Sequence, residues 1–234
     1  MTMLLTTTSP FGIVMAADTR LTWSTGRVED NRRKIVPWDG MRAAVGFAGL
    51  ATLNGGFTDE IIERVTTDRH WNTLDEFAIA LGPELRGRIP AHVTSEDRRI
   101  YVHIAGFGPA GELARAQFHY VRNSEWEVVL DYFQVNEDLR DTFLAQQGIM
   151  TAADLSEGDF FRVQFSGVRP VFARRVQRNL AREVQHLHDL DDIVNWAKGQ
   201  IRGVALDLQR GGHAPVVGEA ALVYKIAPAG VERC

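Results

Sequence analysis

Apolar residues recur along the chain in two patterns, which predict strands and helices. Short runs that alternate with polar residues or are continuously apolar predict β-strands. These runs cover residues 6–8, 13–17, 35–38, 42–47, 99–105, 116–121, 127–133, 159–165 and 220–226. Longer runs with apolar residues three or four apart predict amphipathic helices. They cover residues 50–65, 74–85, 171–187 and 190–208.

The order of these elements predicts how they pack. It reads strands, two helices, strands, two helices and a final strand. Two antiparallel sheets stacked face to face, with a helix pair on each outer side, would bury every apolar face. We therefore expect an α+β fold. No internal repeat, linker or low-complexity segment interrupts the sequence, so residues 1–234 are expected to form a single domain.

Composition and charge narrow the class of protein. Apolar residues make up 45% and charged residues 24% of the 234 residues, as in an ordinary soluble protein. The net charge of −4 gives no general reason to expect nucleic acid or an anionic membrane as a partner. No apolar run approaches the ~20 residues that span a bilayer. The single cysteine, Cys234, and an N-terminus without a basic segment favour a reducing, cytoplasmic location.

The first residues offer a nucleophile together with its own base. Met1 precedes a small residue, the usual condition for removal of the initiator methionine, and its removal would leave Thr2 with a free α-amine beside its hydroxyl. An α-amino group has a pKa of about 7.7–8.0, so much of it is neutral near pH 7. It can then act as the base that activates a threonine hydroxyl.

Two charged residues are expected beside Thr2. Residues 9–12 form a turn cluster between two strands, and a turn centred on residues 10–11 places Thr2 opposite Thr19 and diagonal to Asp18. Lys34 opens the next apolar run, and an ion pair with Asp18 would bring positive charge near the Thr2 amine and lower its pKa. The alternative is that Thr2 is an ordinary second residue and the ion pair is structural.

The same stretch resembles the proteasome β-subunits and their bacterial relatives, which are N-terminal-threonine hydrolases. The resemblance rests on Ala16-Ala17-Asp18-Thr19-Arg20, on Arg33-Lys34-Ile35-Val36 and on Ala44-Val45-Gly46-Phe47-Ala48-Gly49-Leu50. In the family, the threonine, the aspartate and the lysine occur at these spacings. The resemblance implies the four-layer αββα sandwich of the Ntn hydrolases.

The resemblance also implies roles for further residues. The Gly46 N–H would stabilise the oxyanion, the alternative being that this glycine forms a structural bulge. Thr22 would pair its backbone with an extended peptide and would bind substrate together with Gly46 and Ala48. Asp207 and Ser166 would support the Thr2 amine. These are implied roles.

Two positions depart from the family pattern. Alignment on Pro170 places Gly167 where the family has a supporting serine, and Ser166 lies one residue away. Arg210 stands in place of a second serine after Asp207. The residues that would support the Thr2 amine therefore differ from the family pattern. This difference puts the rate of hydrolysis, and activity itself, in question more than the fold.

Other motifs indicate less. Residues 106–111 match the G-x-G-x-x-G pattern of dinucleotide sites, but a strand pattern follows where that motif requires a helix, so we interpret them as a hairpin loop. The histidines are scattered, and no metal or other cofactor is expected. The arginines of residues 169–182 are either a solvated helix face or a contact for an acidic surface on a neighbouring subunit. The first helix offers such acids, namely Asp59, Glu60 and Glu63.

The leading hypothesis is an N-terminal-threonine amidohydrolase, a peptidase of the proteasome β-subunit type. It would act on peptides or unfolded proteins within a homo-oligomer, as a ring or ring-like assembly. Whether an unfoldase partner exists is not indicated by the sequence. Two alternatives stay open: an Ntn amidase or transpeptidase with a narrow substrate, and a catalytically inactive scaffolding subunit of the same fold.

Overall fold

The computed structural model describes most of the chain. It covers residues 2–9, 11–23, 25–93, 100–108, 115–122, 127–134, 162–167, 175–176, 178–179, 182–183, 186–214 and 216–234. Strands predominate among the described residues, and each strand pair is antiparallel.

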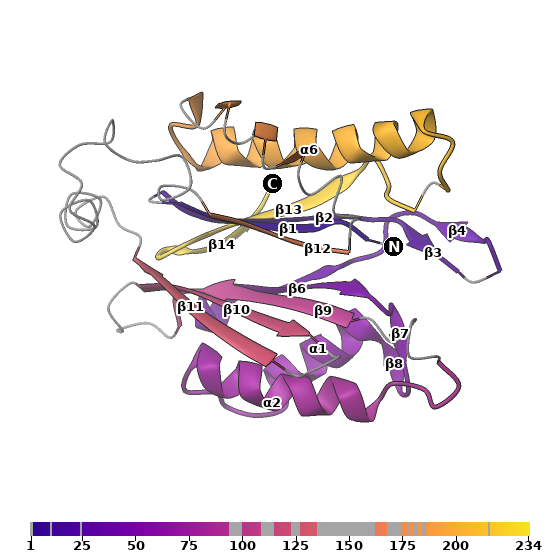
Figure 1. Cartoon of the computed structure of the whole chain (residues 1–234). Helices are drawn as coiled ribbons and strands as arrows, with labels where there is room; N and C mark the ends of the chain where they lie inside the picture. The colour runs from indigo at the N-terminus through magenta and orange to yellow at the C-terminus, as the bar shows by residue number, and fades with distance from the viewer. Residues whose placement is uncertain are drawn as a thin grey trace.

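One five-stranded sheet carries the N-terminal hairpin and the C-terminal strands (Figure 1). Its order is β12-β1-β2-β13-β14. The strands are β1 (Leu4–Ser9), β2 (Gly12–Asp18), β12 (Arg162–Ser166), β13 (Ala221–Ala227) and β14 (Gly230–Arg233). Ser9 pairs with Gly12 and Leu4 with Ala17, which confirms the hairpin register expected from a turn centred on residues 10–11.

The second five-stranded sheet has the order β11-β10-β9-β6-β5. Its strands are β5 (Ile35–Trp38), β6 (Ala43–Gly49), β9 (Ile100–Gly106), β10 (Arg115–Arg122) and β11 (Glu127–Gln134), with a 3-10 turn, η1 (Asp39–Met41), between β5 and β6. β9 and β10 pair directly, with Gly106 opposite Gln117. β9 ends at Gly106, the first residue of the glycine motif, and pairs antiparallel with the next strand, whereas residues 109–111 of the motif lie outside the described residues.

Two short hairpins lie outside these sheets. One joins β3 (Leu21–Thr22) to β4 (Val28–Glu29), and the other joins β7 (Thr52–Leu53) to β8 (Gly56–Phe57). Gly55 and Gly56 have φ angles of +98° and +137°, which residues other than glycine rarely adopt. These glycines form the second hairpin, so the helix expected from residue 50 begins only at Thr58.

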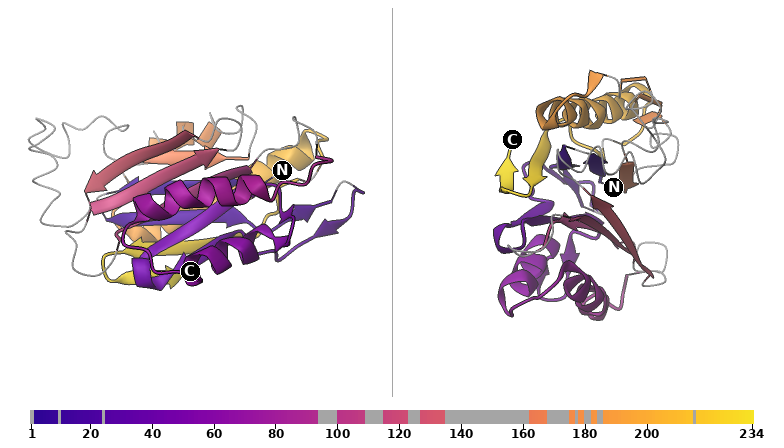
Figure 2. Two further views of the ribbon diagram at one scale, coloured as in Figure 1. Left: turned by 90° about the horizontal axis from the view of Figure 1, so that it is seen from below. Right: turned by 90° about the vertical axis from the view of Figure 1, so that its left-hand side faces the viewer.

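Three α-helices are described: α1 (Thr58–Thr67), α2 (Leu74–Gly87) and α6 (Leu190–Arg210). The first two lie against the second sheet, whereas α6 lies across the first (Figures 1 and 2). Thr73 caps α2 by accepting the Glu76 N–H, and Asp189 caps α6 by accepting the Asp192 N–H, as expected for these residue types. None of the described helices has both the length and the apolar character needed to cross a bilayer.

The buried apolar residues divide into three clusters that follow these layers. One lies between α6 and the first sheet, and includes Leu5, Val14 and Ile201. The second lies between the second sheet and helices α1 and α2. The third fills the space between the two sheets, where Leu4 and Met15 belong to the same cluster as residues of the second sheet.

The four-layer αββα sandwich with a helix pair on each outer side is wrong for the structure described. Within the described residues, α6 is the one continuous α-helix on the first sheet. Of the helix expected at residues 171–187, the helical residues 175–176, 178–179 and 182–183 are described, and most of the segment falls outside the described residues. The part of the chain that the structure describes also forms four sheets where two were expected, because glycine-containing turns fold short segments into the β3–β4 and β7–β8 hairpins. The fold is α+β with strands predominating.

Candidate active site at the N-terminal strand

Asp18 is the centre of the polar contacts next to Thr2. It is the last residue of β2 and is fully buried. Its Oδ1 accepts the Met3 N–H at 2.7 Å, and its Oδ2 accepts the N–H groups of Arg20 at 3.0 Å and Gly218 at 3.1 Å. The Asp18 N–H donates in turn to the Met3 carbonyl at 3.1 Å. The backbone that follows Thr2 is therefore fixed by both the main chain and the side chain of Asp18.

Lys34 lies against the same carboxylate. It immediately precedes β5 and is 1% exposed. Its Nζ donates to Asp18 Oδ2 at 3.0 Å and also to the Arg20 carbonyl oxygen. Burial lowers the pKa of Lys34, and the charge and hydrogen bond of Asp18 oppose that shift. The ion pair expected between Asp18 and Lys34 is present.

Gly167 approaches Thr2 from the end of β12. Its φ angle is +80°, and a Cβ built on it would lie 2.0 Å from the Thr2 carbonyl oxygen and 3.0 Å from the Ala48 Cβ. No side chain fits there, which explains why a glycine stands where the resembled family has a serine. Thr2, Ala48 and Gly167 thus meet, although they come from three different strands or strand ends.

Ser166 makes its contact in the interior. Its hydroxyl is 2.8 Å from Nε2 of His103, a buried residue of β9, and Nδ1 of the same ring is 2.9 Å from the Thr6 hydroxyl. Sequence reasoning missed His103, because it treated the histidines as scattered. The signal available was its alternation with Ile104, which places it on the face of β9 opposite that of this apolar residue.

Gly46 lies in the interior of β6. It is paired with Ile35 on one side and with His103 on the other. A Cβ built on Gly46 would lie 2.6 Å from a Leu4 methyl carbon and 2.8 Å from the Met15 sulfur. The close packing of the two sheets therefore accounts for a glycine at this position, and β6 is continuous there, without the bulge that we considered.

Thr22 and Asp207 occupy separate elements. Thr22 pairs with Val28 in the β3–β4 hairpin, and its buried hydroxyl has no hydrogen-bond partner among the described residues. Asp207 lies in the last turns of α6, where its carboxylate forms an ion pair with Arg175. The structure does not bring Asp207 into the group formed by Thr2, Asp18 and Lys34.

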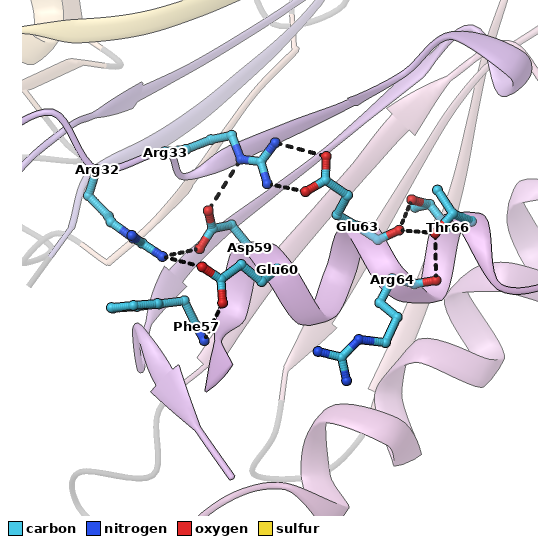
Figure 3. Close-up of polar contacts among 9 residues, drawn as sticks. Arg32, Arg33, Phe57, Asp59, Glu60, Glu63, Arg64 and Thr66 are labelled. Carbon is cyan, nitrogen blue, oxygen red and sulfur yellow. Dashed lines mark hydrogen bonds and ion pairs between the residues drawn. The ribbon is translucent and has the colours of Figure 1, made fainter. Parts of the chain in front are cut away.

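Charged residues on α1 hold the segment that leads into Lys34 (Figure 3). Asp59 accepts hydrogen bonds from Arg32 at 2.9 Å and from Arg33 at 3.2 Å. Arg33 also forms two hydrogen bonds with the Glu63 carboxylate, at 3.1 and 2.6 Å. The two residues before Lys34 are therefore anchored to one helix.

These contacts bring together groups that can take part in acid–base and nucleophilic chemistry. A buried lysine and a buried carboxylate lie beside the start of the chain, where a free α-amine and a hydroxyl would belong to one residue, Thr2. Among the described residues, no group of three or more His, Cys, Asp or Glu side chains is placed to hold a metal ion.

Comparisons with known proteins show which solved structures have a similar fold. No family model matches the chain, and no curated protein matches it in sequence. Its structure is similar to that of Anbu (ancestral beta-subunit) from Yersinia bercovieri, with a TM-score of 0.61 and 13% identity over 99% of this chain and 86% of that chain. It is also similar to the Anbu (Gly-1) mutant from Hyphomicrobium sp. strain MC1, with a TM-score of 0.58 and 13% identity over 100% of this chain and 87% of that chain.

These neighbours correct the resemblance drawn from the sequence. They are Anbu proteins, a proteasome-like family that is distinct from the proteasome β-subunits. The short motifs around Asp18, Lys34 and Gly46 did not separate the two, because they cover only the first strands. At 13% identity the likeness shows a proteasome-like fold and does not by itself assign an activity.

Proposed function

We propose that the chain is an N-terminal-threonine amidohydrolase that cleaves peptide bonds. The observation that carries the proposal is the buried Asp18–Lys34 pair, whose carboxylate holds the Met3 N–H and so fixes the backbone beside Thr2. Taking two charges out of water is costly, and a buried pair is weak support for stability alone. A buried lysine whose pKa is lowered, next to a potential nucleophile, favours a functional role.

The chemistry needs only groups of Thr2 and a water molecule. After removal of Met1, which lies outside the described residues, the Thr2 hydroxyl oxygen attacks the substrate carbonyl carbon and its proton passes to the α-amine. The protonated amine then donates that proton to the leaving nitrogen as the C–N bond breaks, which leaves an ester on Thr2. Water attacks this ester, the acid product leaves, and the hydroxyl is restored.

Lys34 and Asp18 prepare the amine for this task. Positive charge near an amine disfavours its protonation and lowers its pKa toward neutral pH. Asp18 holds the Lys34 ammonium in place, and through the Met3 N–H it also holds the Thr2 backbone. The same carboxylate therefore sets the relative positions of the proposed base and of the charge that tunes it.

The oxyanion donor belongs to β6. Gly46 was expected in this role, but it lies between two paired strands. The Phe47 N–H donates to the Lys34 carbonyl at 3.0 Å, and hydrogen bonds alternate sides along an antiparallel strand. The Gly49 N–H therefore points to the same side, beyond the start of β5, and it follows Ala48, which lies near Thr2. We assign the oxyanion contact to Gly49.

The other implied residues take different parts in the proposal. Thr22 on β3 and Ala48 on β6 remain the residues assigned to the substrate backbone, since Ala48 lies beside Gly167 and Thr2. Ser166 and Asp207 are not assigned to the amine, because their side chains contact His103 and Arg175 instead.

The decisive experiment combines intact mass with turnover. Peptide mass analysis of the purified protein should show Thr2 as the first residue, and a panel of fluorogenic peptide amides should reveal hydrolysis. Thr2→Val should abolish turnover, and Thr2→Ser should retain part of it. The matched control is Thr7→Val, because Thr7 is a buried threonine of β1, the strand that follows Thr2. An acyl group trapped on the Thr2 peptide would identify the nucleophile. Turnover with Met1 retained would overturn the mechanism.

A non-catalytic scaffolding subunit is the second candidate. The observation that favours it is that both residues expected to support the amine, Ser166 and Asp207, are engaged by other side chains. A scaffolding role predicts that neither hydrolysis nor acylation by an activated ester is detected, whether Thr2 is the N-terminal residue or Met1 is retained. Hydrolysis confined to small amides or transfer to an added amine would instead indicate the narrow amidase or transpeptidase.

We also propose that the protein works as a homo-oligomer. The first neighbour is named as a subunit, which supports assembly as a general mode. The acids of α1, considered above as a candidate contact with a neighbouring subunit, are engaged within the chain, because Asp59, Glu60 and Glu63 contact Arg32 or Arg33. Native mass spectrometry of the full chain tests assembly, and an active monomer at micromolar concentration would contradict it.

A further inference from the structure

His103 connects the two sheets beneath the Thr2 end of the chain. It lies on β9 and is fully buried. Its Nδ1 is 2.9 Å from the Thr6 hydroxyl and its Nε2 is 2.8 Å from the Ser166 hydroxyl. The Phe118 ring packs edge-on against the imidazole, with centroids 5.2 Å apart and an interplanar angle of 78°. Both nitrogens have partners and the ring orientation is restrained.

The two hydroxyls belong to neighbouring strands that lead to the proposed site. Thr6 lies on β1, four residues after Thr2. Ser166 is the last residue of β12, pairs with Leu4, and directly precedes Gly167. One ring of the second sheet therefore holds both strands of the first sheet whose ends meet at the Thr2 carbonyl.

The imidazole is a neutral connector. Burial lowers the pKa of His103 to about 3, so the ring carries no charge near pH 7. A neutral imidazole has one N–H and one lone pair, and a hydroxyl can donate or accept, so both contacts are satisfied with either tautomer. No proton needs to move through this group for it to act.

The contact between His103 and Ser166 affects the position of Gly167, the residue that follows Ser166. A Cβ added at Gly167 would overlap the Thr2 carbonyl oxygen, so a shift of the β12 end changes the space in which Thr2 lies. Misplacement of a reacting group by about 1 Å costs on the order of 100-fold in rate. We propose that His103 is a positioning residue for Thr2, acting through the Ser166 hydroxyl on the turn at Gly167.

The proposal rests on the proposed function for its kinetic readout, but it has a second readout that does not need turnover. Local hydrogen exchange of the peptides that contain residues 2–9 and 162–167 reports whether these strand ends are held. If wild-type protein has no hydrolase activity, the proposed function fails, while the exchange measurement still decides the role of His103.

The variants of His103 distinguish the contribution of the Nε2 contact from that of the Nδ1 contact. His103→Gln places an amide near the position of Nε2 and keeps the Ser166 contact, whereas His103→Asn places one near Nδ1 and keeps the Thr6 contact. His103→Leu removes both contacts. The matched control is His119→Leu, because His119 is a buried histidine of the adjacent strand β10 and its ring lies by Asp75 of α2.

We expect His103→Leu and Ser166→Ala to lower kcat by about 10- to 100-fold with KM little changed, in line with a misplaced nucleophile. Both should speed local exchange at residues 2–9 and 162–167. His103→Gln should restore both readouts more fully than His103→Asn, and His119→Leu should alter neither. If His103→Leu does not fold, the comparison of Gln, Asn and Ser166→Ala carries the test.

Two results would overturn the proposal. One is a set of His103 and Ser166 variants that lose global stability but keep wild-type kcat and local exchange. The other is equal behaviour of His103→Gln and His103→Asn, which would show that the Ser166 contact has no special part.

Discussion

A side chain at Gly167 would collide with the carbonyl oxygen of Thr2, since its Cβ would lie 2.0 Å from that atom. Gly167 also has a φ angle of +80°, which L-residues rarely adopt. The turn after β12 and the first described residue of the chain are thus in direct contact, and the glycine is required for two separate reasons.

The first prediction uses two glycine variants to distinguish the effect of the Thr2 contact from the effect of the positive φ angle. Gly167→Ala should lose most activity and destabilise the protein, because the strain of a left-handed backbone, about 1–2 kcal/mol, adds to the displacement of Thr2. Gly212→Ala is the matched control, since its φ is +66° and no atom lies within 4 Å of the added Cβ. Urea unfolding and peptide hydrolysis are measured on both. Equal losses would show that the Thr2 contact is unimportant.

The second prediction concerns the buried ion pair. Lys34→Met should cost about 3–5 kcal/mol of unfolding free energy, because it leaves the Asp18 carboxylate buried without its counter-charge. It should also remove most turnover. Lys225→Met is the control, because Lys225 pairs with exposed carboxylates and should cost only about 0–1 kcal/mol. Lys34→Met with normal hydrolysis would exclude lysine from the mechanism.

The third prediction is a loss of stability in acid. The pKa of His103 is about 3 in the folded chain and about 6.5 when unfolded, so its contribution is complete above pH 6.5 and is lost as the pH falls toward 3. Between pH 7 and pH 4.5 the loss is roughly 2–3 kcal/mol. Urea titrations at both pH values measure it.

The acid prediction has an internal comparison. His103→Gln should be less stable than wild type at pH 7 but should lose less on going to pH 4.5. Burial also lowers the pKa of His119, with Asp75 opposing the shift, so His119→Gln should remove a separate part of the acid sensitivity. An unchanged pH dependence in the His103 variant would contradict a neutral buried imidazole.

Local patterns predicted the N-terminal part of the structure well. Turn residues around position 10 and alternating strands determine the register that places Asp18 beside Met3, and the position of Lys34 at the start of an apolar run places it near Asp18. The contact of Asp18 with Met3 depends on two strands of one sheet joined by a short turn, and turn chemistry and strand period are sufficient for such a case. The Asp18–Lys34 pair instead joins the end of β2 to the residue before β5 of the other sheet.

Long-range contacts were not predictable in the same way. His103 is 97 residues from Thr6 and 63 from Ser166 in sequence, and no single-sequence pattern links them. Gly55 and Gly56 lie within residues 50–65, where a helix was predicted, and the separate hairpin found there depends on their positive φ angles. The short strands that result are one reason why the regular sandwich was wrong.

The last prediction tests how α1 supports Lys34. Asp59 is buried and joins α1 to Arg32 and Arg33, the two residues that precede Lys34, whereas Glu63 contacts Arg33 from an exposed position. Asp59→Asn should cost about 1.5–3 kcal/mol, the range for hydrogen bonds to charged groups, while Glu63→Gln should cost about 0–1 kcal/mol.

The two variants should also differ in turnover. A displaced Arg32–Arg33 segment moves Lys34 relative to Asp18, so kcat should fall for Asp59→Asn and stay near the wild-type value for Glu63→Gln. Unfolding in urea and hydrolysis of one peptide amide are measured on both proteins at low and high salt. Because the Glu63 pair is exposed, salt should weaken its contribution more than that of Asp59. Equal kinetic effects in the two variants would show that α1 stabilises the fold without positioning the lysine.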